Sequence, residues 1–285
     1  MFNASAEFVD VYVGFARYIS LLYLVFQGII ICNFCYSWSD RWVQNYFNSG
    51  EGFIWAFWLV FFSSLLWVGA ITFFILDIYW FAWLGCDINI FVITFTPVVG
   101  VVFTVLSVTP LVKHGSLLTS SGILLYWVYL DWDALSSDPR KDWNPNWQDS
   151  YATSLSILYG CIPVTVVMFY LVFGEVKSRD PQREIIREIV NPMLEDACQN
   201  DFNQSQRDWQ FFWFLMYMAF ASVFMAMNLT NWSAADIGGN HDKQNSSNVW
   251  IKIIAEWITV IFYVVSLFSP HFWKKKNDMY IPLST

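Results

Sequence analysis

Long apolar runs separated by polar connections dominate the chain. They cover about Phe8–Phe34, Phe53–Trp80, Ile88–Val112, Leu117–Leu135, Thr153–Phe173, Trp209–Trp232 and Val249–Trp273. A helix rises about 1.5 Å per residue and the hydrocarbon core of a membrane is about 30 Å thick, so runs of this length predict membrane-spanning helices. Strands of a membrane barrel would instead alternate over about ten residues. The pattern predicts an all-α, polytopic transmembrane helical bundle with about seven spans, forming a single domain over residues 1–285.

Two features interrupt this pattern. Pro97 and Gly100 lie inside the third run, where they predict a kink or a locally unwound turn. The one long polar connection is Gly174–Arg207, and within it Glu184–Val190 alternates charged and apolar residues at helical spacing. We expect residues 174–207 to form a cytoplasmic loop that carries a helix at the membrane surface.

The 15 Lys and Arg residues are unevenly distributed along the chain. If the 174–207 connection is cytoplasmic, ten of them fall on that side, three fall on the other, and Arg17 and Lys252 lie within apolar runs. Cytoplasmic loops carry an excess of cations in membrane proteins. This distribution predicts a C-terminus inside and, with seven spans, an N-terminus outside. An outside N-terminus without a signal peptide is unusual, and the alternative is that further helices precede Met1.

Composition supports a membrane location and argues against several other functions. Hydrophobic residues make up 56% of the chain and charged residues 13%, against about 25% charged residues in soluble domains. A net charge of −8 argues against nucleic-acid binding, which needs clustered cations. Cys32 and Cys35 lie three residues apart in an apolar run, which favours packing thiols over a redox pair. Because no catalytic or metal-binding motif is found, the sequence predicts neither an enzyme nor a cofactor.

Charged residues within the apolar runs are the first candidates for function, because a charge in a membrane span is costly unless it is paired or hydrated. Lys252 and Glu256 are four residues apart and share one helix face. They predict either a charged pair that lines a polar path or headgroup site, or a pair that neutralises itself near the outer end of the helix while Lys252 snorkels. Arg17 either snorkels or pairs with a carboxylate of a neighbouring helix.

Three acidic residues fall at the predicted outer ends of the second and fourth runs. Asp77 lies near the end of the second run, and Asp131 and Asp133 lie near the end of the fourth. One interpretation is that they are interfacial acids in contact with water. The other is that they form an acidic rim around a site that recognises an amine, such as a serine or ethanolamine headgroup.

Small hydroxyl residues open the fourth run. Thr119, Ser120 and Ser121 follow Lys113 and His114 at the predicted start of a helix. Such residues commonly cap the first-turn N–H groups, and a helix N-terminus also attracts anions such as phosphate. Capping alone and a lipid-phosphate site beside Lys113 both remain open. Asn231 and Asn245 begin glycosylation sequons on the predicted outer side.

Several motifs resemble the serine incorporator family of eukaryotic membrane proteins. The strongest begins at Ser116–Ser121 and continues through Leu125, Tyr126, Tyr129, Leu130, Trp132 and Ala134–Ser136 to Pro139. Other similar positions are Phe34, Ser37, Trp38, Trp42, Val43, Ala221, Ser222, Leu229–Trp232, Val249, Trp250, Lys252, Trp257, Tyr263 and Pro270. Glu256 replaces a small residue of the family pattern, so its proximity to Lys252 is particular to this chain.

The resemblance implies a fold and a range of functions. Family members have ten helices, and the order of the motifs makes the seven runs here correspond to helices four to ten. The first run would then be a long diagonal helix that divides two helical subdomains. The family's proposed roles are delivery of serine to phosphatidylserine and sphingolipid synthesis, and lipid scrambling between leaflets, none of which needs a catalytic group.

The main hypothesis is therefore a serine-incorporator-like protein that binds or moves polar lipid headgroups through Lys252, Glu256, Ser120, Ser121 and Asp131. The alternative is a non-catalytic structural subunit or scaffold of a membrane complex. The expected partners are membrane lipids, with a second copy of the chain left open and nucleic acid excluded. The expected location is the plasma membrane or the endomembrane system.

Overall fold

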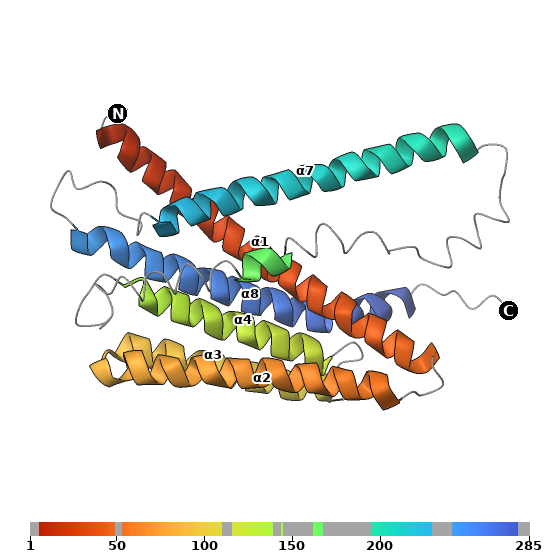
Figure 1. The fold of residues 1–285 in the computed structure, drawn as a ribbon, viewed down its shortest axis with the longest axis horizontal. Helices are drawn as coiled ribbons and strands as arrows, with labels where there is room; N and C mark the ends of the chain where they lie inside the picture. Colours follow the sequence, from red (N-terminus) through yellow and green to blue (C-terminus); the bar gives the residue numbers. More distant parts are fainter. Residues whose placement is uncertain are drawn as a thin grey trace.

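The computed structural model describes residues 6–48, 53–109, 116–138, 144, 162–167, 195–229 and 241–278, and these are helical apart from short connections. The elements are α1 (Ala6–Asn48), α2 (Phe53–Phe81), the 3-10 turn η1 (Ala82–Leu84), α3 (Asp87–Val108), α4 (Leu117–Ser136), α7 (Glu195–Leu229) and α8 (His241–Asp278). Residues 162–167 form a further short helical segment. Figure 1 shows the long helices arranged as a bundle with one diagonal member.

The predicted all-α membrane bundle is confirmed. Five helices, α1, α2, α3, α7 and α8, are long and apolar enough to cross a membrane. The predicted bounds of α2, α3 and α4 differ from the observed ones by only a few residues. Of the predicted span at 153–173 only residues 162–167 are described, and the expected surface helix at 184–190 lies outside the described residues. The end of the expected 174–207 loop is helical, because α7 already begins at Glu195.

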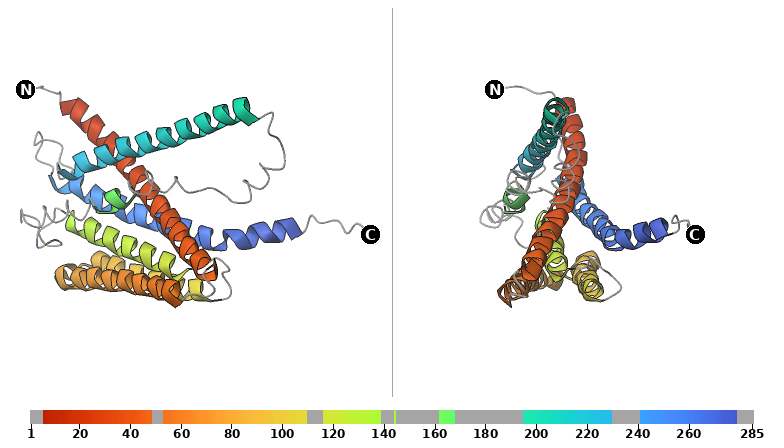
Figure 2. Two further views of the ribbon diagram at one scale, coloured as in Figure 1. Left: turned by 45° about the vertical axis from the view of Figure 1, so that its right-hand side comes forward. Right: turned by 90° about the vertical axis from the view of Figure 1, so that its right-hand side faces the viewer.

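α4 occupies the centre of the bundle. Seventeen of its 20 residues are buried, and α1, α2, α3 and α8 all pack against it. In both views of Figure 2, α4 lies inside the group that α1, α2, α3 and α8 form. α4 contains two aspartates and several hydroxyl residues, and it is not among the five helices that are apolar enough to cross a membrane by themselves. A helix of this composition is compatible with a membrane because its neighbours, rather than lipid, surround it.

α1 is a diagonal helix of 43 residues, as the family resemblance implies. It crosses the bundle between α7 on one side and α2, α4 and α8 on the other (Figure 1). The predicted first span ended at Phe34, but the helix continues without a break to Asn48. α1 therefore connects α7 to the remaining described helices.

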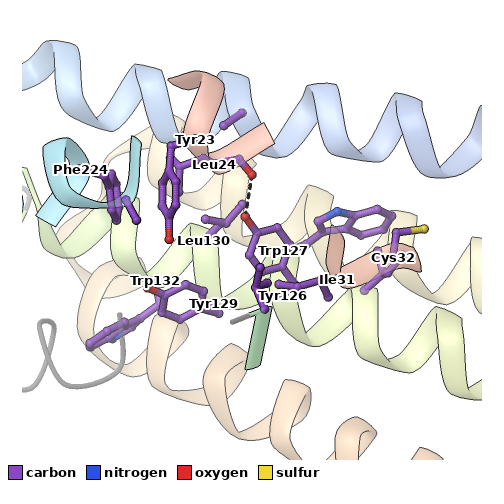
Figure 3. Packing of buried hydrophobic residues seen from close by; sticks show 14 of the residues in the cluster. Tyr23, Leu24, Ile31, Cys32, Tyr126, Trp127, Tyr129, Leu130, Trp132 and Phe224 are labelled. Atoms are coloured by element: carbon purple, nitrogen blue, oxygen red, sulfur yellow. Dashed lines mark hydrogen bonds between the residues drawn. The ribbon is translucent and has the colours of Figure 1, made fainter. Parts of the chain in front are cut away.

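A chain of buried hydroxyl and amide groups joins α4, α1 and α7. The Tyr126 hydroxyl donates to the Leu24 carbonyl oxygen at 3.0 Å, as Figure 3 shows. Gln27 Nε2 donates to the Tyr23 hydroxyl at 3.1 Å, and this hydroxyl lies 3.3 Å from that of Tyr217. The Tyr23 ring also stacks on Phe224, with centroids 4.9 Å apart. Polar groups at membrane depth need such internal partners, and these bonds fix how the three helices cross.

The cysteines of α1 pack in the core as predicted. Cys32 and Cys35 are both buried and both carry free thiols. Cys35 lies against α4, where an added Cβ at Gly122 would come within 2.6 Å of its Sγ atom. The pair therefore fills space between helices.

A close contact between α3 and α4 explains why a glycine, Gly100, lies in the third span. α3 is helical throughout from Asp87 to Val108 with Pro97 inside it, so of the two expected outcomes, a kink or an unwound turn, the unwound turn does not occur. An added Cβ at Gly100 would lie 2.1 Å from Leu124 Cδ1 of α4. A residue without a side chain is needed here because small residues let membrane helices approach closely.

The α1–α8 crossing gives a direct test of this packing. In Gly28→Ala, the new Cβ would lie 2.5 Å from Thr259 Cγ2. Thr259 cannot rotate freely, because its hydroxyl bonds the Glu256 carbonyl oxygen and the Trp127 indole. We expect Gly28→Ala to lower the stability by about 1–3 kcal/mol, measured by thermal unfolding in detergent.

Gly14→Ala is the matched control for this prediction. It lies on the same helix, and nothing is within 4 Å of an added Cβ. Alanine is the better helix former, so this variant should be as stable as the parent or slightly more stable. Equal stability of the two variants would contradict a close approach at Gly28.

Candidate functional site

The most unusual feature of the bundle is a group of ionisable side chains buried where α2 and α4 end and α3 and α8 begin. We call it the charged cluster, and its members are Asp77, Asp131, Asp133, Lys252 and Glu256. None of the five is more than 3% exposed. The alternative of water-exposed interfacial acids is therefore wrong for Asp77, Asp131 and Asp133. They lie inside the protein, at the end of the bundle that the cation distribution predicts to be outer.

Lys252 pairs with an aspartate of the central helix. Its Nζ atom lies 2.7 Å from Asp133 Oδ2 and donates to the Asp133 carbonyl oxygen at 3.1 Å. The expectation that Lys252 pairs with Glu256 or snorkels was therefore wrong. The i,i+4 spacing places the two residues on one face, but the ammonium turns towards α4, where a carboxylate and a carbonyl are both available.

Glu256 instead joins α8 to α3 and α4. Thr96 Oγ1 donates to Glu256 Oε1 at 2.6 Å, and the carboxyl group of Asp131 lies within hydrogen-bonding reach of both. Glu256 Oε2, Asp131 Oδ1 and Asp77 Oδ1 are buried without a hydrogen-bond partner among the described residues. Buried carboxyl oxygens are normally satisfied, so these three require an explanation.

The charged cluster is one end of a polar stripe that runs along three helices. Its members are buried residues of polar type or small size, spaced three, four or seven positions apart on α3 and α8. They are Asn89, Thr96, Gly100, Thr104 and Ser107 on α3, and Lys252, Glu256, Thr259 and Tyr263 on α8. α4 completes the stripe, because Trp127 Nε1 donates to Thr259 Oγ1 at 3.2 Å and Ser107 Oγ donates to Ser120 Oγ at 3.2 Å.

α3 and α8 leave a seam over this stripe. Both helices pack on α4, and they meet each other across the seam through side chains, such as the rings of Phe103 and Tyr263, whose centroids are 6.2 Å apart. Phe95 of α3 and Trp257 of α8 meet across the seam with ring centroids 6.4 Å apart. Each is 39% exposed, so this aromatic pair separates the buried Thr96–Glu256 hydrogen bond from the outer surface.

The hydroxyl residues of α4 have a different role from the predicted one. Ser116 is the N-cap residue and makes no side-chain capping bond. Ser120 Oγ bonds the Leu117 carbonyl oxygen at 3.1 Å, and Ser121 Oγ bonds the Leu118 carbonyl oxygen at 2.9 Å. The capping expectation was wrong because the helix begins earlier than these residues, which return their hydroxyls to the preceding turn.

The structure thus brings together only part of the predicted set. Lys252, Glu256 and Asp131 share the charged cluster, whereas Ser120 lies at the opposite end of the polar stripe and Ser121 is next to it. Lys113, His114 and Asn231 lie outside the described residues, and Asn245 falls within α8.

Sequence reasoning missed the contribution of α3. Thr96, Thr104 and Ser107 were not singled out, although each is buried on the polar stripe. Together with Asn89 and Gly100, they recur at helical spacing within an otherwise apolar span. That periodicity was the available signal.

Comparison with known proteins identifies the family. The family model described as "Serine incorporator (Serinc)" matches residues 1–197 and 175–276. The chain belongs to the serine incorporator family. It is 23% identical over 308 residues to a probable serine incorporator of Nematostella vectensis, covering 94% of this chain and 67% of that protein. The resemblance drawn from the motifs is thereby confirmed, and the chain is a multi-pass membrane protein of this family.

Vertebrate relatives show similar coverage. The chain is 25% identical over 295 residues to serine incorporator 3 of Bos taurus, covering 87% of this chain and 62% of the relative. It is 24% identical over 299 residues to serine incorporator 2 of Homo sapiens, covering 93% and 64%. The chain therefore spans about two thirds of the length of the serine incorporators it matches.

The Lys252–Asp133 pair predicts a measurable asymmetry between single and double variants. Asp133→Asn leaves a buried ammonium without its carboxylate, which costs about 3–5 kcal/mol. The double variant Asp133→Asn with Lys252→Met also removes the ammonium and replaces it with an apolar side chain of similar length. Much of the stability lost in Asp133→Asn should therefore be recovered. Thermal unfolding of the four proteins in a double-mutant cycle measures the coupling. Additive losses would contradict a direct ion pair.

Proposed function

We propose that this serine incorporator binds polar lipid headgroups and moves them along the polar stripe, with entry through the seam between α3 and α8. The observation that carries the proposal is the charged cluster, because five ionisable side chains buried in a membrane bundle are costly to keep. A polar path lets a headgroup pass through the protein while the acyl chains remain in the surrounding lipid.

The chemistry of the cluster suits headgroups that carry both signs of charge. The carboxyl oxygens of Asp131 and Glu256 that have no partner in the described structure are acceptors for an ammonium group. The Lys252 ammonium lies one helical turn from Glu256. It can donate to phosphate or carboxylate oxygens when its ion pair with Asp133 opens. Further along the stripe, Thr104, Ser107 and Ser120 supply hydroxyl groups.

The closed state of the seam fits a gated path. The side chains of the charged cluster are buried. The aromatic pair Phe95–Trp257 closes the seam beside Glu256. α3 and α8 each pack on α4, and the contacts between them are made by side chains: the Thr96–Glu256 hydrogen bond and the ring pairs Phe95–Trp257 and Phe103–Tyr263. We propose that a lipid enters when the two rings part and the Thr96–Glu256 hydrogen bond opens.

The names of the relatives attribute serine incorporation to those proteins. Delivery of serine to phosphatidylserine and sphingolipids, and lipid scrambling, both involve moving an amine-bearing polar group at the membrane. The polar stripe would serve either role without a catalytic group.

A blocked path tests the proposal. Thr104 is buried midway along the stripe, and in Thr104→Leu the hydroxyl is replaced by a larger apolar group. We expect purified protein in liposomes to expose labelled headgroups of the inner leaflet to an external quencher, and the variant to do so about tenfold more slowly, equivalent to about 1.4 kcal/mol in the barrier.

Val105→Leu is the matched control, because Val105 is 59% exposed on the opposite face of the same helix. It should move lipid at the parental rate, and thermal unfolding should show both variants folded. Unchanged leaflet asymmetry with the parent protein, together with stable co-purification of fixed partners, would support the scaffold alternative and overturn the proposal.

A further inference from the structure

Asp131 and Glu256 present an electrostatic problem that lipid movement does not resolve. Their carboxyl groups approach each other between α4 and α8, and both side chains are at least 98% buried, being 2% and 1% exposed. One oxygen of each has no hydrogen-bond partner in the described structure. Two adjacent buried carboxylates repel each other, so something must neutralise one of them.

The neighbouring groups do not supply that neutralisation. On α8, Lys252 is the nearest cation along the helix, but its ammonium is engaged by Asp133 of α4. On α3, Thr96 donates one hydrogen bond to Glu256 and carries no charge. On α2, Asp77 adds a third buried carboxyl group that acts electrostatically on Asp131.

The remaining packed helix, α1, contacts α4 mainly through neutral groups. Its Gln27 and Tyr23 belong to the hydrogen-bonded chain around Tyr126. Arg17 lies further towards the N-terminus of α1 and is partly buried. The balance of charges around Asp131 and Glu256 is therefore acidic.

A proton fits this site better than a metal ion. A proton between two carboxyl groups forms a short O–H···O⁻ hydrogen bond and removes one of the two charges. A metal ion needs several oxygen ligands held apart at its coordination distance. Among the described residues, no group of three or more His, Cys, Asp or Glu side chains is arranged to hold one.

We infer that Asp131 and Glu256 bind one shared proton, forming a protonation site inside the bundle that holds α8 against α4. When the pH rises, the O–H bond breaks, the proton passes to water or hydroxide, and both carboxylates become charged. Their repulsion then loosens α8 from α4 beside the seam. This inference rests on the geometry of the pair and goes beyond the proposed lipid movement, so either can fail without the other.

The pH dependence of thermal stability tests the site. In the full chain in detergent, we expect the melting temperature to fall as the pH rises from mildly acidic to mildly alkaline. A group protonated in the folded state and ionised in the unfolded state contributes stability that is lost as the pH rises. In the double variant Asp131→Asn with Glu256→Gln, amides of similar shape replace both acids, and this pH dependence should become clearly weaker, the remainder coming from the buried Asp77.

The control is Asp87→Asn, an acid-to-amide change at an exposed position of α3. It should keep the parental pH profile. A double variant that retains the parental profile would overturn the inference. Stabilisation of the parent by sodium or potassium at constant ionic strength, absent in the double variant, would assign the site to a metal cation and also overturn it.

Infrared spectroscopy gives a readout that survives a change in stability. The parent protein at neutral pH should show a carboxylic-acid C=O band, shifted on exchange into deuterium oxide, that corresponds to one protonated group per chain. If the double variant does not fold, the single variant Asp131→Asn takes its place. In this variant the carboxylic-acid band should be lost, because the amide can donate a hydrogen bond to an ionised Glu256. A parent spectrum without such a band would contradict a shared proton.

Discussion

The structure depends on how the polar groups of α4 are satisfied inside a membrane bundle. Hydrocarbon offers no hydrogen-bond partners, so each buried polar side chain must find one within the protein. The pairing of Lys252 with Asp133 is the strongest of these contacts and joins α8 to α4. The hydrogen-bonded chain Tyr126–Gln27–Tyr23 joins α4 to α1, and α7 packs against α1.

The same constraint explains which faces meet lipid. α2 is the most exposed of the candidate spans, since only 11% of its most apolar stretch of 18 residues is buried. Its outward residues are large and apolar, such as Phe57, Phe61 and Ile75. α3 is largely apolar outward, and five of its seven buried residues are polar or small. Many of the buried polar groups thus collect where α3, α4 and α8 converge, beneath the seam.

The sequence predicted the spans well and their contacts poorly. Apolar length alone located α2, α3 and α4 closely, because a membrane span must be long, apolar and helical. α1 was predicted too short because the apolar run ends near Phe34, whereas the helix continues through the mixed polar and aromatic residues that follow it. Spacing placed Lys252 and Glu256 on one face, but it could not identify the opposing helix. Only the fold brings Asp133 to the lysine and Thr96 to the glutamate.

The family resemblance supplied what periodicity could not. It implied that the first long helix is diagonal, which the arrangement around α1 confirms (Figure 1). It offered no guide to Glu256, since that residue departs from the family pattern. The role of the hydroxyl residues of α4 was misjudged because the helix begins at Leu117, two residues before the group that was expected to cap it.

We propose that lipid headgroups pass through the seam between α3 and α8. Reversible closure of the seam tests it most directly, with cysteines introduced by Phe95→Cys and Trp257→Cys, whose parent rings already meet. In liposomes, bridging the two cysteines with a reducible bifunctional thiol reagent should stop headgroup exchange, and reduction should restore it, while each single variant remains insensitive to the reagent. Exchange at an unchanged rate through the cross-linked protein would contradict this account.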